Sequence, residues 1–194
     1  FEGERCNMTE KTTMPAIALR GLTIFPGMII HFDLSREKSI SAVEKAMMND
    51  QKVFLVTQKS ADTENPDIDD VFTIGTIAEI KQISKLPNKI VRILVDGLEK
   101  ARLIQFEESK ELLIADIEPL ETQTDEKADY ETDAMNRQIQ EMLEEYSRYY
   151  PKEGKTIATF MEEENEPDTA YLMGLLNHIG MNLPIDFLKK QRVL

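Results

Sequence analysis

Residue types that could catalyse a reaction or bind a metal are few in this sequence. Its 194 residues include one cysteine, Cys6, and two histidines, His31 and His178. A single cysteine can form neither a disulfide nor a multi-thiolate zinc site within one chain. His31 lies in an apolar, strand-like segment, His178 lies in the last turn of a predicted helix, and neither has a second ligand at a suitable spacing. Structural roles explain both histidines, so we expect no metal-binding or catalytic residue.

Phosphate-binding and nucleophile motifs are missing as well. The sequence contains neither Gly-x-x-x-x-Gly-Lys-Ser/Thr nor Gly-x-Gly-x-x-Gly, and no serine lies in a Gly-x-Ser-x-Gly elbow. Ser35 and Lys38 are close in sequence, but helix capping explains Ser35 better than a Ser–Lys pair does, because its hydroxyl can accept a hydrogen bond from a first-turn amide. A small hydrolase is thus a weak hypothesis, and we expect no cofactor and no peptidase or ATPase turnover.

The charge and hydropathy of the chain exclude two classes of partner. The formal net charge is −13 at pH 7, with no cluster of Lys and Arg, whereas nucleic-acid binding through phosphates needs a basic face. The longest apolar runs, such as 22–30, are interrupted by Pro26 and Gly27 and fall short of the roughly 18 residues of a membrane helix. Residues 1–14 do not resemble a signal peptide. We expect a cytoplasmic protein that binds neither nucleic acid nor membrane.

Residues 14–119 are predicted to form a β-domain. Leu86-Pro87-Asn88 indicates a hairpin, and Asp96-Gly97 indicates a second tight turn, because glycine accepts positive φ. One helix, with Ser35 as its N-cap and Ile40, Val43, Ala46 and Met47 at helical spacing, interrupts the strands. The strand-like segments are 17–19, 28–34, 53–57, 74–83, 89–95, 98–106 and 112–117. Short strands with turns at this spacing predict a small barrel or sandwich.

The remaining residues are predicted to form a tail, a linker and a helical subdomain. Residues 1–13 lack a periodic pattern; residues 1–7, which precede Met8, are either added residues or part of a native disordered tail. Residues 120–132 form an acidic linker, and 133–194 a helical subdomain that the end of the chain truncates within its last helix. The first helix of this subdomain has an apolar stripe, which Pro151 and Gly154 end; the stripe consists of Met135, Ile139, Met142, Leu143, Tyr146 and Tyr150. Pro167 and Gly180 are expected to bound a second helix. In the last helix, Phe187 and Leu188 are expected to face inward.

One segment of the β-domain is a candidate for binding another protein. The loop 22–27 is too apolar for an ordinary solvent-exposed loop, so it either packs back onto the strands or offers a surface to a partner. The ten methionines leave a similar choice, for which core filling is favoured over an adaptable binding surface. The candidate protein-binding residues are Leu22, Ile24, Phe25, Met28 and Leu86.

Ordered motifs over about ninety residues carry a resemblance to a known family. The matching pieces are Pro15 with Leu19-Arg20, Phe25-Pro26-Gly27-Met28, Arg36-Glu37-Lys38-Ser39-Ile40, Gln58-Lys59, the segment 70–76, Lys85-Leu86-Pro87 and the segment 94–102. The helical part matches more loosely, mainly through Glu166-Pro167-Asp168. In the order and spacing of these motifs, the chain resembles the N-terminal domain of Lon, the ATP-dependent protease.

This resemblance implies an α+β fold, with a PUA-like small β-barrel carrying one helix followed by an α-helical bundle. It implies recognition of unfolded or damaged protein substrates and support of a homohexamer. ATP and Mg would belong to an AAA+ module, and catalysis to a Ser–Lys protease domain, neither of which is in this sequence. No catalytic or cofactor-binding residue is therefore carried over. A stand-alone Lon-like protein that acts as an adaptor is the alternative, which the gene sequence beyond Leu194 would distinguish.

Overall fold

The computed structural model describes residues 11–107, 109, 111–120, 130–162 and 169–194. The chain divides into two compact units, residues 1–120 (the β unit) and residues 121–194 (the helical unit). Together they have the mixed α+β composition that was predicted. Cys6, most of the predicted tail and linker, and the Glu166-Pro167-Asp168 motif lie outside the described residues.

The β unit is built around a ring of five strands. Strand order is β2-β5-β4-β3-β1-β6, and an additional β5–β6 pairing closes the ring and leaves β2 paired only with β5. Strands β1 and β3 are parallel and the other pairs are antiparallel. The elements are β1 (Thr12–Leu19), β2 (Ile29–Leu34), α1 (Glu37–Met47), β3 (Lys52–Thr57), the 3-10 turn η1 (Ile68–Asp70), β4 (Ile74–Lys85), β5 (Val91–Glu107) and β6 (Leu113–Pro119).

Strand β5 contains Asp96-Gly97, and the tight turn predicted there is wrong. Gly97 is buried inside a continuous strand of 17 residues. The Gly27 N–H donates to the Gly97 carbonyl oxygen at 2.7 Å, and the Gly97 N–H donates to the Met28 carbonyl oxygen at 3.0 Å. A Cβ on Gly97 would lie 2.3 Å from the Phe25 carbonyl oxygen. Glycine is needed here so that two backbones can touch, and not for a turn.

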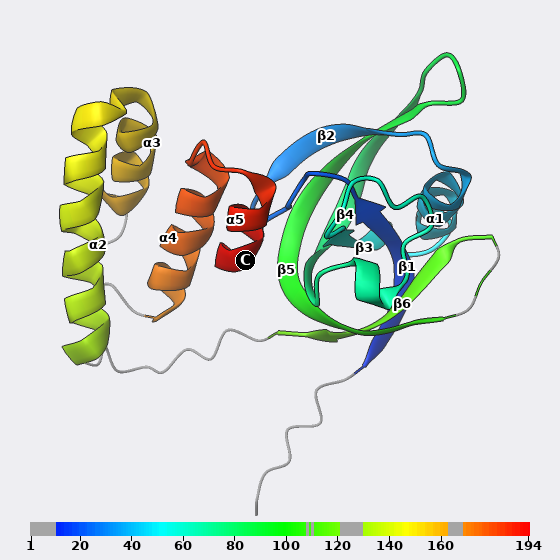
Figure 1. Cartoon of the computed structure of the whole chain (residues 1–194), viewed down its shortest axis with the longest axis horizontal. Helices are drawn as coiled ribbons and strands as arrows, with labels where there is room; N and C mark the ends of the chain where they lie inside the picture. Colours follow the sequence, from blue (N-terminus) through cyan, green and yellow to red (C-terminus); the bar gives the residue numbers. More distant parts are fainter. Residues whose placement is uncertain (1–10, 108, 110, 121–129, 163–168) are drawn as a thin grey trace, which may run out of the picture. The chain divides into compact units, whose positions relative to one another are not determined.

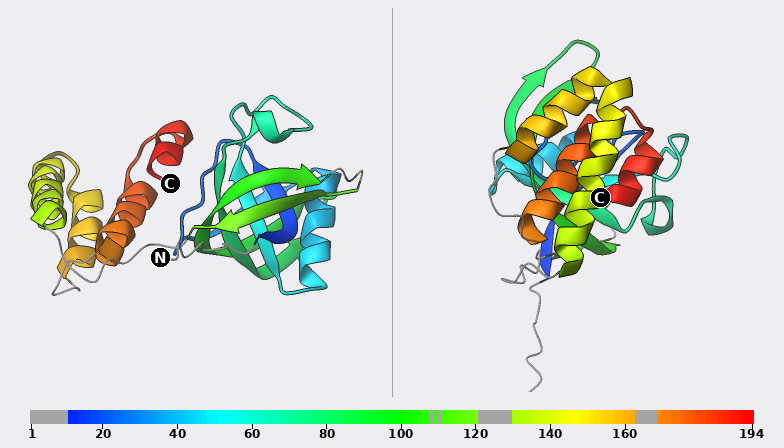
Figure 2. Two further views of the ribbon diagram at one scale, coloured as in Figure 1. Left: turned by 90° about the horizontal axis from the view of Figure 1, so that it is seen from below. Right: turned by 90° about the vertical axis from the view of Figure 1, so that its left-hand side faces the viewer.

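Both faces of the central strand β3 are buried in apolar clusters. Val53 and Leu55 belong to the cluster under α1, whereas Phe54 and Val56 belong to the cluster on the other face. This explains why β3 reads as a continuous apolar run rather than an alternating one. The helix α1 lies against the strands in all views (Figures 1 and 2) and buries Ala42, Val43 and Ala46 in the first cluster.

The start of α1 differs from the prediction. Its N-cap is Arg36, not Ser35, and no side chain caps the first turn. Arg36 has an extended backbone (φ −79°, ψ 133°), and its carbonyl oxygen accepts the Ile40 N–H at 3.0 Å, so the helix begins at Glu37. Of the residues at helical spacing, Val43 and Ala46 are buried, whereas Met47 is 40% exposed.

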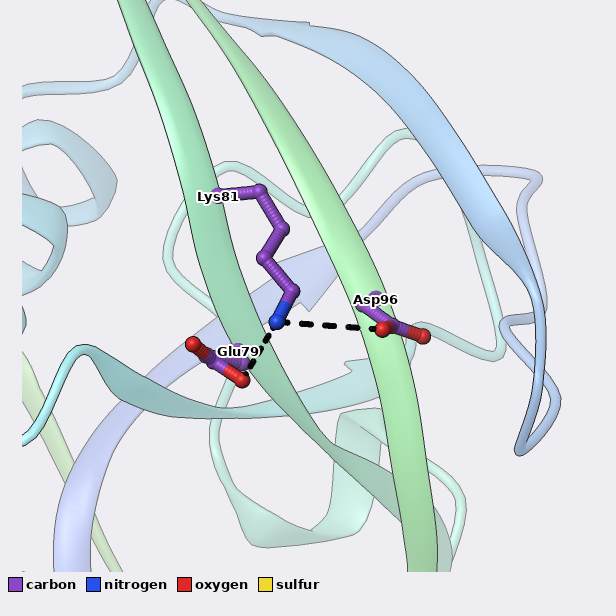
Figure 3. Close-up of polar contacts among 3 residues, drawn as sticks. All are labelled: Glu79, Lys81 and Asp96. Carbon is purple, nitrogen blue, oxygen red and sulfur yellow. Dashed lines mark hydrogen bonds and ion pairs between the residues drawn. The ribbon is translucent and has the colours of Figure 1, made fainter.

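A cluster of three charged side chains lies on the β4–β5 pair, where the register of the pairing shifts. The register shifts between Ile80 and Gln82, at Lys81. The Lys81 Nζ lies 2.7 Å from Glu79 Oε2 and 3.9 Å from Asp96 Oδ2 (Figure 3). The hydrogen bond to Glu79, together with the charges of Glu79 and Asp96, raises the pKa of Lys81 above its ordinary value. Because Lys81 is exposed and the two acids are only half-buried, the cluster contributes little to the free energy of unfolding.

The described residues of the helical unit form four helices, and three of them share a small apolar cluster. The four helices are α2 (Tyr130–Tyr149), α3 (Pro151–Glu162), α4 (Thr169–Asn182) and α5 (Phe187–Val193). The cluster, which α2, α3 and α4 share, contains Ile157, Tyr171, Leu172 and Leu175, with Ile139, Leu143 and Ile179 packed against it. No helix in the described part of the chain is long and apolar enough to cross a membrane.

Several details of the helical prediction are wrong. Met135, Met142 and Tyr150 of the predicted apolar stripe are 57%, 58% and 49% exposed, and Leu188 is 46% exposed. The predicted breaks at Gly154 and Gly180 lie inside α3 and α4. A Cβ on Gly154 would lie 2.2 Å from Ser147 Oγ, so this glycine permits close packing of α3 on α2.

The contact at Gly97 makes a stability prediction. Gly97→Ala forces the backbone of residue 25 to move, and we expect it to lower the free energy of unfolding of the β unit by about 1–3 kcal/mol. Glu99→Ala, on the exposed side of the same strand, is the control. Urea unfolding followed by far-ultraviolet circular dichroism measures the effect on the whole chain. Tyrosine fluorescence reports the unfolding of the helical unit alone, because all five tyrosines lie there. Equal midpoints for the two variants would contradict the prediction.

Candidate protein-binding surface

The apolar loop 22–27 packs back onto the strands. Ile24 is 2% exposed and Phe25 is fully buried. The Thr76 hydroxyl, itself buried, donates to the Ile24 carbonyl oxygen at 2.6 Å and fastens the loop to β4. Ile24 and Phe25 are therefore core residues. Their predicted place on a protein-binding surface is wrong, because side chains without solvent exposure cannot contact another protein.

The other three candidates remain accessible but do not line one hollow. Leu22, Met28 and Leu86 are half-buried. Leu22 and Met28 pack against the cluster under α1, and Leu22 lines a small hollow beside Phe32 of β2. Leu86 instead lines a groove at the tip of the β4–β5 hairpin. Of the five predicted residues, two thus lie in the core, two lie at its margin, and Leu86 alone lines the groove.

The groove at Leu86, here called the Leu86 groove, runs between α1 and the β4–β5 hairpin. Its volume is about 440 Å³. Four aliphatic side chains supply the apolar lining, and two acids and two lysines lie around them. The lining consists of Ile40, Leu86, Ile90 and Val91 with Ser41, Glu37, Glu44, Lys85 and Lys89. An apolar floor of this kind suits an apolar side chain of a bound segment.

The charged rim of the Leu86 groove is only loosely tied together. The Lys85 Nζ lies 3.9 Å from Glu44 Oε1, and the two side chains are 79% and 57% exposed. An exposed pair at this distance contributes little free energy. It can therefore separate when a ligand enters, at little cost.

The hairpin tip beside the groove has an unusual backbone. Asn88 and Lys89 have φ angles of 62° and 60°, and the Leu86 N–H donates to the Ile90 carbonyl oxygen at 2.8 Å. Asparagine adopts this conformation readily, but a lysine there costs roughly 1–2 kcal/mol. Two consecutive residues with positive φ are what a tight hairpin turn requires, so the turn itself accounts for this conformation.

A second hollow, the arginine cleft, lies at the start of α1. Its volume is about 750 Å³, and Arg20, Arg36 and Lys38 line it together with Glu64 and Glu111. Burial, and then the nearby Arg20, lower the pKa of Arg36 from its ordinary value, while Glu64 raises it. Acids and bases are mixed in this cleft, which gives it no clear preference for an anion.

The hydrogen bonds of the arginine cleft indicate a structural role. The Arg36 Nη2 donates to Gln58 Oε1 at 2.7 Å and to the Thr63 carbonyl oxygen at 3.1 Å. Gln58 is fully buried and also donates to the Thr63 carbonyl oxygen, at 3.0 Å. The Arg20 Nη2 reaches the same oxygen at 3.3 Å. The two arginines thus hold the loop after β3 in place.

Comparison with known proteins shows the family. Residues 13–194 match the family model described as the ATP-dependent protease La (LON) substrate-binding domain. The chain belongs to this family. The matched region is the substrate-binding part of Lon and not its catalytic part.

Curated Lon proteases match nearly the whole chain. It is 37% identical to Lon protease of Lachnoclostridium phytofermentans over 188 aligned residues. The alignment covers 96% of this chain and 23% of that relative. It is 40% identical over 158 residues to Lon protease of Clostridium acetobutylicum, covering 81% of the chain and 20% of that relative. The chain thus spans less than a quarter of the length of these relatives.

Solved Lon N-terminal domains share the fold. The N-terminal domain of a Mycobacterium avium complex Lon protease aligns with a TM-score of 0.61 at 15% identity, covering 94% of this chain and 95% of that one. A Lon N-terminal domain protein from Xanthomonas campestris aligns with a TM-score of 0.56 at 13% identity, covering 90% of this chain and 84% of that one.

Sequence reasoning named Leu86 as a candidate but did not bring together the other residues that line its groove. Ile40 was assigned to the core face of a helix, and Ile90 to a strand, because nothing local shows that α1 and the hairpin tip are neighbours. The positive φ at Lys89 has no sequence signal at all, since lysine is not a usual left-handed residue. In the part of the chain that the structure describes, no three His, Cys, Asp or Glu side chains are grouped to hold a metal ion.

The two arginines of the cleft are expected to differ in their contribution to stability. Arg36→Ala leaves the buried Gln58 amide oxygen without its 2.7 Å donor, so we expect a loss of about 1–3 kcal/mol in the free energy of unfolding. Arg20→Ala removes one long, exposed hydrogen bond, and we expect a change within about 0.5 kcal/mol. Urea unfolding of both variants measures the difference, and equal losses would contradict the structural role of Arg36.

Proposed function

We propose that this chain is the substrate-recognition part of a Lon protease, which binds exposed apolar segments of unfolded or damaged proteins in the Leu86 groove. The observation that carries the proposal is the accessible apolar floor of this groove, formed by α1 and the hairpin tip. The family description as a substrate-binding domain supports it. Folded proteins bury such segments, so a shallow apolar groove selects unfolded chains without a fixed sequence motif.

The proposed contact is weak in a single copy. Burying one aliphatic side chain contributes about 1.5–3 kcal/mol, and ordering a flexible ligand consumes part of this gain. A homohexamer would present six linked grooves, and linkage raises the effective concentration without any new contact. We therefore include hexamer support in the proposal. ATP binding with Mg, and peptide hydrolysis by a Ser–Lys pair, are assigned to the remaining length of the Lon relatives.

The proposed setting is the cytoplasm, with proteins as the partners. The formal net charge of −13 disfavours contact with nucleic acid. The same charge predicts that unfolded segments carrying lysine or arginine beside their apolar residues associate faster than acidic ones, and less so at high salt.

Substitution of Leu86 tests the groove. We expect Leu86→Ser to weaken binding of an unfolded polypeptide about tenfold, because about 1.4 kcal/mol of apolar contact is lost. The probe is a labelled protein whose cysteines have been reduced and alkylated with iodoacetamide, so that it stays unfolded without added charge. Fluorescence anisotropy measures the dissociation constant.

Leu98→Ser is the matched control, since Leu98 is 37% exposed on β5 and does not line the groove. Circular dichroism checks that both variants are folded. Unchanged binding by Leu86→Ser would exclude the groove. If the wild-type chain bound no unfolded polypeptide at all, substrate recognition by this domain would be refuted.

A further inference from the structure

Strand β2 has one unpaired edge. It pairs with β5 through the register Ile29↔Asp96 to Leu34↔Val91 and has no second neighbour among the described strands. The other five strands are each paired on both sides within the closed ring. Figure 1 shows β2 on the outside of β5. The open side of β2 is therefore a sheet edge that another strand could join.

The ladder shows which residues present their backbone to this open side. The Gly97 N–H donates to the Met28 carbonyl oxygen, so the pair of residues 28 and 97 is hydrogen-bonded. In an antiparallel ladder bonded pairs alternate, and residues 30, 32 and 34 therefore bond to β5. The N–H and C=O groups of Ile29, His31 and Asp33 point to the open edge. No backbone hydrogen bond from the described residues beyond β5 reaches these three.

The side chains of β2 anchor the strand and leave its edge lightly protected. Ile30, Phe32 and Leu34 pack in the cluster under α1, whereas Ile29 is 67% exposed. Edge strands usually carry charges or proline that discourage pairing. The one acid here, Asp33, is neutralised, because Arg92 of β5 donates to its two oxygens at 2.6 and 2.9 Å.

We infer that the open edge of β2 binds an extended segment of an unfolded polypeptide by strand addition. This inference rests on the proposed function and specifies its chemistry. The three outward-facing residues offer amide and carbonyl groups that match the backbone of any polypeptide in an extended conformation. A folded protein has already used these groups internally, so backbone pairing selects unfolded chains whatever their sequence.

The edge and the Leu86 groove are close enough to act on one segment. Strand β2 ends at Leu34, and Glu37, three residues later, lines the groove. Three residues span at most about 11 Å. Backbone pairing along β2 would hold the chain, and the groove would take an apolar side chain from it.

Amide hydrogen exchange, measured by NMR on the whole chain, tests the inference directly. With the alkylated unfolded polypeptide as probe, exchange at Ile29, His31 and Asp33 should slow at least tenfold. The amides of Ile30, Phe32 and Leu34, which already bond to β5, should change less than twofold. Unchanged exchange at the first three amides, with the polypeptide bound, overturns strand addition.

Proline substitution supplies a second test. His31→Pro removes an amide that points to the open edge, and proline is tolerated at such positions of edge strands. We expect at least tenfold weaker binding of the unfolded polypeptide, whereas His31→Ala, which keeps the amide, should stay within twofold of wild type. Ile29→Pro and Ile29→Ala repeat the comparison at the first residue of the strand, should His31→Pro fail to fold.

The outcomes separate this inference from the proposed function. If unfolded polypeptide binds and both proline variants bind it as their alanine controls do, strand addition is wrong and the proposed function stands. If the wild-type chain binds no unfolded polypeptide, both are wrong. If His31→Pro instead dissociates a dimer of this chain in the absence of polypeptide, the edge belongs to a second copy and the inference is overturned.

Discussion

The contact between Gly97 and the Phe25 carbonyl is the constraint on which the β unit depends. Strand β5 must serve two sets of neighbours, with β2 along its first part and β6 along its last part. The change occurs around Gly97, where the missing Cβ lets the 25–28 turn lie directly on the strand. This contact sets the start and register of β2. The residues that β2 presents at its open edge follow from this register.

Much of the fold could be predicted because it depends on local patterns. Apolar runs predicted the strands, and helical spacing predicted the helices, whereas several boundaries predicted at glycine are wrong. The errors arise where a residue serves a distant contact. Asp96-Gly97 has the composition of a turn, yet Gly97 makes room for Phe25, and Gly154 makes room for Ser147 in the same way. Ser35 has the chemistry of an N-cap, but the backbone stays extended for one more residue and the helix begins after Arg36.

The candidate site was only partly accessible to sequence reasoning. Leu86 was named as a candidate on the predicted hairpin, and its role in binding stays a prediction. Ile24 and Phe25 were misassigned, since an apolar loop reads alike whether it packs inward or faces a partner. The open edge of β2 is a property of topology, because which strand lacks a neighbour depends on how the ring closes. No local pattern in the sequence encodes it.

The central claim is that the face formed by α1, the β4–β5 hairpin and β2 receives unfolded polypeptide. Site-specific photocross-linking tests it most directly, with the photoreactive residue placed in turn at Leu86, inside the Leu86 groove, and at Leu98, outside it. The account predicts strong cross-links from position 86 to an unfolded polypeptide, none to the same protein in its folded form, and none from position 98. Equal cross-linking from both positions, or cross-linking to the folded protein, would contradict it.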